Sequence, residues 1–141
     1  MSRHRSRHRA VQVLYGCDIR KTAPEESISQ YYGGLYTEES EEDLEKDPFM
    51  EELVHGVFNR RPEIDKHLDS ASENWRVERM PAVDRNILRL AVFELLEAKL
   101  PAPVVIDEAL ELARRFSGEE AVPFVNGVLD GVRKQISAAA S

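Results

Sequence analysis

Apolar residues recur at three- and four-residue steps along most of the chain, which is the spacing of one face of an α-helix. The first stripe predicts a helix from Arg7 to about Ile19. A second stripe follows Pro24, where a proline and two acids are typical of a helix start. Glycine is unfavourable inside a helix, so this second helix is expected to end at Gly33 and Gly34.

The middle of the chain contains a strongly polar break. Residues 37–47 have almost nothing to bury, and we interpret them as a mobile acidic segment. Asp47 and Pro48 then predict a new helix start, with Asp as the N-cap and Pro at the first helical position. Pro62 interrupts the pattern, because proline disfavours the helical conformation in the residue before it. A further stripe ends at Trp75, which we interpret as a core anchor.

The C-terminal half carries three more stripes. The first follows Pro81 and is apolar over a wide face, as expected of a largely buried helix. The second follows Pro103 and is expected to end at Gly118, since glycine commonly terminates a helix. The third runs over residues 125–136. The whole pattern predicts an all-α fold of about six or seven helices in a single domain over residues 1–141.

Composition limits the class of protein. Hydrophobic residues make up 42% of the 141 residues, which argues against global disorder. Cys17 is the single cysteine, so an internal disulfide and a cysteine-based zinc site are both excluded. It lies on a helix face that must bury something, which favours an inert core thiol. A single cysteine without a disulfide partner favours a reducing, cytoplasmic location. No stretch approaches the roughly 18 uncharged apolar residues of a membrane span.

Charge is distributed very unevenly. The formal net charge of −7 excludes a uniformly basic nucleic-acid binder. Residues 1–9, the basic arm, nevertheless hold four arginines and no acid, whereas residues 25–52 hold eleven acids and one lysine. Any RNA contact is therefore expected at the basic arm and its adjoining helix. The acidic remainder favours a basic protein partner.

Catalytic and metal-binding motifs are lacking in the sequence. None of the four histidines stands in a metal-ligand motif such as H-E-x-x-H. The chain has no P-loop, no G-x-G-x-x-G motif and no serine in a nucleophile elbow. We therefore predict a protein that is not an enzyme and that uses no cofactor or metal.

The basic arm has the composition of a phosphate-binding element, because the planar fork of arginine suits phosphate. The following helix carries Gln12 and Tyr15, an amide that can bond base edges and a ring on which an unstacked base can stack. Two alternatives stay open. The arm can be a solubilising tail, and Tyr15 can be a core ring with its hydroxyl at the edge.

Two C-terminal segments have more than one interpretation. Gly127 interrupts an apolar helical pattern, for which a close approach of two helices is the simplest explanation. Asn126 stands where it can cap the start of that helix. Arg85 and Arg89 lie four apart on one helical face, which fits an exposed ion-pair face or a protein-docking face.

Four segments together resemble the NusB family of bacterial transcription antitermination factors. They are RSRHRAVQVLY at residues 5–15, VDRNILRLAVFEL at 83–95, PVVIDEALELARRF at 103–116 and FVNGVLD at 124–130. Their order, their spacing and the total length all fit, so the resemblance covers nearly the whole chain. The last three segments together are specific, whereas the basic arm alone is not.

The resemblance implies two small helical bundles packed against each other, without catalytic activity. It implies a factor that binds boxA RNA together with NusE, a small-subunit ribosomal protein, and supports processive transcription, notably of ribosomal RNA operons. NusA and NusG would be its companions in the RNA polymerase antitermination complex. The alternative is a non-catalytic protein-interaction module without direct RNA contact. A monomer and a homodimer are both compatible with the sequence.

On matching positions, the resemblance implies an RNA surface built from the arm, the first helix and the FVNGVLD segment. Its members are Arg3, Arg5, Arg7, His8, Arg9, Gln12, Tyr15, Phe124, Asn126 and Asp130. The implied NusE face comes from two C-terminal helices, with Asp84, Arg85, Arg89, Phe93, Glu94, Asp107, Glu108 and Glu111. Because His4 and His8 lie among the arginines, the charge of the arm is expected to rise below about pH 6.5.

Overall fold

The computed structural model describes residues 2–38 and 46–140. These described residues form nine helical elements. Seven are α-helices: α1 (Arg3–Arg20), α2 (Pro24–Glu38), α3 (Pro48–Asn59), α4 (Arg61–Ala71), α5 (Ala82–Glu97), α6 (Ala102–Phe116) and α7 (Val122–Ala140). Two are 3₁₀ turns, η2 (Val77–Arg79) and η3 (Glu119–Ala121). The described residues contain no strand, so the predicted all-α fold is confirmed.

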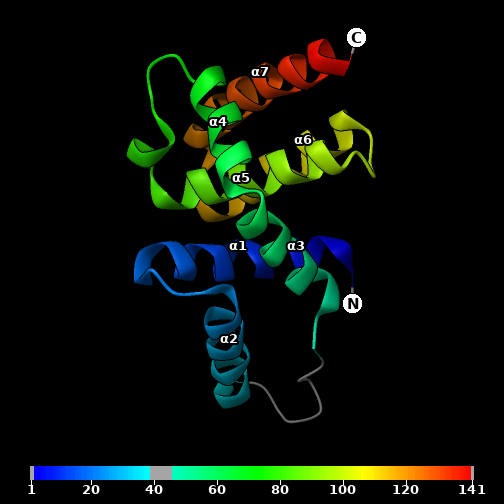
Figure 1. Cartoon of the computed structure of the whole chain (residues 1–141). Helices are drawn as coiled ribbons and strands as arrows, with labels where there is room; N and C mark the ends of the chain where they lie inside the picture. The colour runs from blue at the N-terminus through cyan, green and yellow to red at the C-terminus, as the bar shows by residue number, and fades with distance from the viewer. Residues whose placement is uncertain (1, 39–45, 141) are drawn as a thin grey trace.

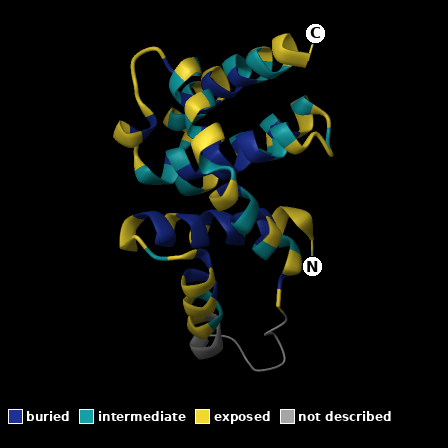
Figure 2. Cartoon of the chain, viewed as in Figure 1, coloured by how far each residue is buried: buried dark blue, intermediate teal, exposed yellow. Residues whose placement is uncertain are grey.

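The helices form two groups that meet along α5 (Figure 1). Helices α1, α2 and α3 pack together in one group, and α4, α6 and α7 pack around α5 in the other. Helix α5 also contacts both α1 and α3, so it joins the two groups. Figure 2 shows the buried residues gathered along α1 and between the C-terminal helices, while α2 is largely exposed. None of the described helices combines the length and the apolar character needed to cross a membrane.

Several helix ends follow the predicted local signals. The Asp47 carboxylate caps α3 by accepting a hydrogen bond from the amide of Met50 at 3.0 Å, and Pro48 occupies the first turn. Gly118 follows the C-cap of α6 with a φ of 114°, and its amide donates to the carbonyl of Ala113 at 2.9 Å. A positive φ of this size favours glycine. These predicted ends are therefore confirmed.

Other boundaries differ from the prediction. Helix α1 begins at Arg3, earlier than its apolar stripe indicates, because the Ser2 hydroxyl caps it by accepting from the amide of Arg5 at 3.2 Å. Residues 3–9 are thus helical. Helix α2 continues past Gly33 instead of ending there, although each glycine costs about 1 kcal/mol relative to alanine. Of the predicted acidic segment, residues 39–45 lie outside the described residues.

Two predictions about packing are wrong. Trp75 is not a core anchor, because it lies in the connection between α4 and η2 with 49% of its surface exposed. Gly127 does not mark a close approach of two helices, since a Cβ at that position would meet no atom within 4 Å. Close approaches are at Gly56 of α3, which lies against the ring of Phe93 on α5, and at Gly131 of α7, where a Cβ would lie 3.2 Å from the Cβ of Ala71 on α4.

Replacing Gly56 with alanine is expected to lower the free energy of unfolding by about 1–2 kcal/mol. The added methyl group would overlap the Phe93 ring, and overpacking of this kind costs about 1–3 kcal/mol, partly offset by the better helix propensity of alanine. Urea denaturation measures the change. Gly33→Ala is the matched control, because open space surrounds Gly33 and the substitution should raise stability by about 0.5–1 kcal/mol. Equal effects at the two positions would contradict the argument.

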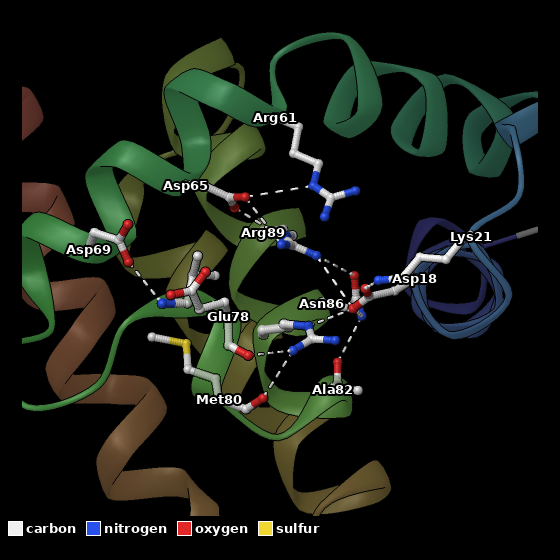
Figure 3. A network of polar contacts seen from close by, with 12 residues as sticks. Asp18, Lys21, Arg61, Asp65, Asp69, Glu78, Met80, Ala82, Asn86 and Arg89 are labelled. Atoms are coloured by element: carbon white, nitrogen blue, oxygen red, sulfur yellow. Dashed lines mark hydrogen bonds and ion pairs between the residues drawn. The ribbon is translucent and has the colours of Figure 1, made fainter.

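A network of buried charges fastens α1 to the C-terminal group (Figure 3). The Asp18 carboxylate of α1 accepts hydrogen bonds from Arg85 Nε at 2.5 Å and from Asn86 Nδ2 at 3.0 Å. Arg89 lies 3.5 Å from the same carboxylate and donates to both oxygens of Asp65 on α4, at 2.9 and 3.1 Å. The side chains of Arg85 and Arg89 are only 15% and 4% exposed. They do not form an exposed face, which corrects that interpretation.

Candidate nucleic-acid interface

Two of the four arginines in the basic arm have buried side chains that form internal ion pairs. Arg7 is 4% exposed and donates from Nε and Nη2 to the two carboxylate oxygens of Glu94, at 2.8 and 2.7 Å. The hydrogen bond to Glu94 raises the pKa of Arg7. Arg9 is also buried, with Nη1 3.9 Å from the Asp47 carboxylate. Both guanidinium groups are buried in internal ion pairs, and the contact of Arg7 and Arg9 with RNA stays a prediction.

The remaining basic side chains of the arm are accessible. Arg3 and Arg5 are exposed, and the Arg3 guanidinium lies 4.3 Å above the centre of the Phe49 ring. A cation held over a ring still presents its outer edge to solvent. The arm therefore offers two accessible guanidinium groups, whereas its sequence contains four.

The two histidines of the arm form a small cluster with α6. His4 Nδ1 lies 2.9 Å from a carboxylate oxygen of Glu108, and His8 Nε2 lies 3.1 Å from His4 Nε2. Burial lowers the pKa of His8, and the nearby charges of His4 and Arg115 lower it further. The predicted rise in arm charge below about pH 6.5 therefore begins at a lower pH for His8.

An open pocket of about 600 Å³ lies where α1, α5, α6 and α7 meet. Tyr15 of α1 and Phe124 of α7, far apart in the sequence, both line it. Tyr15 is 40% exposed, so it is not a core ring, and that alternative is excluded. Phe116 and Trp75 complete the aromatic lining. The sequence interpretation missed Trp75 as a surface residue, although its polar Ser-Glu-Asn context is typical of an exposed connection.

A second hollow, of about 340 Å³, adjoins the first at Tyr15. Gln12 and Arg20 line it, and the Gln12 side-chain carbonyl accepts a hydrogen bond from the Tyr31 hydroxyl at 3.0 Å. The predicted residues Gln12, Tyr15 and Phe124 are thus brought to neighbouring hollows, with Arg20 as an exposed cation that the sequence interpretation did not identify.

Asn126 and Asp130 lie on α7 outside the lining of the aromatic pocket. Asn126 is exposed and does not cap the helix, which begins at Val122. The Asp130 carboxylate pairs with Arg133 at 2.7 Å and with Lys134 at 3.1 Å, and hydrogen bonds from these two residues lower its pKa. Its negative charge is therefore largely compensated.

The predicted partner-binding residues divide by helix. On α5, Arg89 and Phe93 are buried, Arg85 pairs with Asp18, and Glu94 pairs with Arg7. Asp84 is buried as well and accepts a hydrogen bond from the Ser117 hydroxyl. The α5 members therefore make contacts inside the protein, and their assignment to a partner-docking face stays a prediction.

The α6 members do reach the surface. Asp107 and Glu111 are exposed, and Glu108 is half-buried beside His4. These three acids lie on one face of α6 next to the start of α1, and we call them the α6 acidic face. They are the accessible part of the predicted partner site.

The geometry as a whole suits base stacking. Exposed rings border hollows that also contain an amide and a guanidinium, which are the groups that bind unstacked bases and the adjoining backbone. Within the described part of the chain, no three His, Cys, Asp or Glu side chains are grouped so that they could hold a metal ion.

The model of the NusB family matches residues 4–134. The chain belongs to the NusB family. A transcription antitermination protein NusB from Solibacter usitatus is 55% identical, over 96% of this chain and 90% of the relative. The NusB of Bacillus subtilis is 37% identical, over 96% of this chain and 98% of the relative. The protein is therefore an antitermination factor of this family and not an enzyme.

Solved NusB structures share the fold. T. maritima NusB superposes with a TM-score of 0.80 at 31% identity, over 96% of this chain and 92% of that chain. A structure of the antitermination factors NusB and NusE in complex with double-stranded RNA gives a TM-score of 0.77 at 29% identity, over 96% and 99% of the two chains. The NusB of that complex is thus found with both RNA and a protein partner.

Proposed function

We propose that the protein binds boxA RNA together with NusE and so supports processive transcription, notably of ribosomal RNA operons, in a complex with NusA, NusG and RNA polymerase. The observation that carries the proposal is the convergence of Tyr15 and Phe124 on one open pocket. The relative solved with NusE and RNA supports the same pair of partners.

Electrostatics favour an RNA site that two proteins share. With Arg7 and Arg9 held in internal ion pairs, the arm contributes Arg3 and Arg5, and each phosphate contact on a single strand adds only about −0.7 to the salt slope. Residues 10–141 carry a net charge of −11, which repels RNA. We therefore expect much of the affinity to come from stacking on the rings and from a basic partner.

The α6 acidic face is the surface that suits this basic partner. Its carboxylates complement a positively charged ribosomal protein, and complementary charge raises the association rate and fixes orientation. The face adjoins Arg3 and Arg5 at the start of α1 through the contact between His4 and Glu108. A partner docked there would extend the positive surface offered to RNA.

A titration of fluorescently labelled boxA RNA, with and without NusE, tests the RNA site. Tyr15→Ala and Phe124→Ala are each expected to weaken RNA binding by about 5- to 150-fold, because a stacked base is worth about 1–3 kcal/mol. Phe58→Ala is the matched control, since Phe58 is also 40% exposed but lies on α3. Unchanged affinity for both pocket variants would refute the site.

The alternative, a protein-interaction module without RNA contact, gives a different outcome in the same experiment. Asp107→Lys reverses a charge on the α6 acidic face and should weaken NusE binding, whereas Glu26→Lys on the exposed face of α2 should not. A protein whose NusE affinity responds to Asp107→Lys, and whose RNA binding ignores Tyr15→Ala, would be such a module. Light scattering of the free protein in parallel reports whether it is a monomer or a homodimer.

A further inference from the structure

We propose that Trp75 is an additional stacking platform for RNA, and that a single strand passes from the Tyr15 pocket across Trp75 and Phe124 into a further hollow at Gly127. This inference rests on the proposed RNA-binding function and extends its site beyond the residues that the family resemblance implies.

The position of Trp75 is the first observation. It is the only tryptophan of the chain, and 49% of its surface is exposed, next to the aromatic pocket. A large exposed ring at the rim of a pocket presents a face on which a base can stack, without sequence preference, because every base has a π-face.

The hollow beyond Trp75 is the second observation. It has a volume of about 400 Å³, and Trp75 and Phe124 line both this hollow and the aromatic pocket. Gly127 forms part of its wall, and no atom lies within 4 Å of the position that a Cβ would take there. A glycine inside a helix costs about 1 kcal/mol relative to alanine, and here no packing contact explains it. The missing side chain leaves the hollow open for a ligand.

The order of the hollows gives a continuous track. Tyr15 borders the hollow that contains Gln12 and also the aromatic pocket, and Trp75 and Phe124 border the aromatic pocket and the hollow at Gly127. Rings therefore stand at each junction between successive hollows. Alternating rings and open spaces fit a single strand whose bases stack in succession.

In the aromatic pocket and the hollow at Gly127, the charges favour contact through bases over contact through phosphates. Glu120 lines the aromatic pocket and Glu73 lines the hollow at Gly127, and both would repel a phosphate at close range. Arg76, next to Trp75, is 68% exposed and already pairs with Asp69 and Glu78. The strand is therefore expected to turn its bases toward the protein and its backbone toward solvent.

Because the chain has a single tryptophan, intrinsic fluorescence reports on Trp75 directly. In the experiment, a single-stranded RNA that carries boxA is titrated into the full-length protein in the presence of NusE. The NusE concentration is kept constant, or NusE is replaced by a variant without tryptophan. Saturable quenching is expected, with the same Kd as the labelled-RNA titration. Trp75→Ala should weaken RNA binding by about 5- to 150-fold, and Trp75→Phe should restore most of the affinity.

A second variant tests the track without altering the segment between α4 and η2, which contains Trp75. Gly127→Glu places a carboxylate in the open hollow without a steric clash and should weaken RNA binding at least several-fold. Gly33→Glu is its matched control, since it adds the same charge at an exposed helical glycine on α2. Circular dichroism verifies that each variant remains folded.

The outcomes separate this inference from the function on which it rests. If Tyr15→Ala weakens RNA binding while Trp75→Ala and Gly127→Glu leave it unchanged, the track is refuted and the RNA function stands. If Trp75→Ala weakens only NusE binding, Trp75 is a protein contact and the track is again refuted. If the wild-type protein with NusE does not bind the RNA, both proposals fail.

Discussion

Replacing Asp18 with alanine is expected to lower the free energy of unfolding by about 3–5 kcal/mol, the usual cost of removing one partner of a buried ion pair. The Asp18 side chain is 3% exposed and balances the positive charges of Arg85 and Arg89. Without it, Arg89 keeps Asp65 as a carboxylate partner, whereas Arg85 keeps only hydrogen bonds to the backbone carbonyls of Glu78 and Met80. The loss should loosen the contact between α1 and the C-terminal helices.

Urea denaturation followed by circular dichroism measures this change. Glu52→Ala is the matched control, because Glu52 pairs with Lys99 at 3.3 Å in an exposed position, where an ion pair contributes about 0–1 kcal/mol. Asp18→Asn, which keeps the size but loses the charge, should fall between the two. A cost for Asp18→Ala no larger than that for Glu52→Ala would show that the network does not hold the two groups together.

The same network predicts how stability depends on pH. Burial raises the pKa of Asp18, but hydrogen bonds from Arg85 and Asn86 and the charges of Arg85 and Arg89 outweigh burial and lower it overall. A carboxylate with a lowered folded pKa stabilises the protein above its unfolded pKa of about 3.9 and loses that contribution as the pH falls through the folded value. The difference between wild type and Asp18→Ala should therefore be constant from pH 7 to about 5 and shrink in strong acid.

Local signals in the sequence were sufficient for much of the fold. The N-cap at Asp47 and the terminating Gly118 act on atoms within a few residues, so their effects can be predicted without knowing the tertiary structure. The predictions about packing that were wrong concerned contacts between distant segments. Whether Trp75 is buried, or which glycine meets another helix, depends on which surfaces finally pack together.

The candidate site was predictable to a similar extent. The family resemblance identified Tyr15 and Phe124, and the structure places them in one pocket. It could not tell a free arginine from a paired one, because Arg7 meets an acid 87 residues away in the sequence. The four arginines look like a continuous basic arm in the sequence. In the structure, two of their side chains are exposed and two are buried.

This division leads to a second prediction with a large effect: Arg7→Ala is expected to lower the free energy of unfolding by about 3 kcal/mol. The substitution leaves Glu94, whose side chain is only 11% exposed, without the guanidinium that binds both of its oxygens. Breaking a buried pair costs about 3–5 kcal/mol, and the lower end applies because Glu94 keeps some contact with solvent. Thermal or urea unfolding measures the loss.

Arg5→Ala is the matched control, since it removes an exposed arginine two positions away on the same helix. It should change stability by less than about 0.5 kcal/mol and weaken RNA binding slightly, with a smaller salt dependence. The double variant Arg7→Met with Glu94→Leu removes both charges at once and should recover much of the stability lost by Arg7→Ala, because a buried pair replaced by apolar side chains is often neutral. If Arg7→Ala instead remains as stable as Arg5→Ala and loses RNA affinity, Arg7 is an RNA contact and its pairing with Glu94 does not persist in solution.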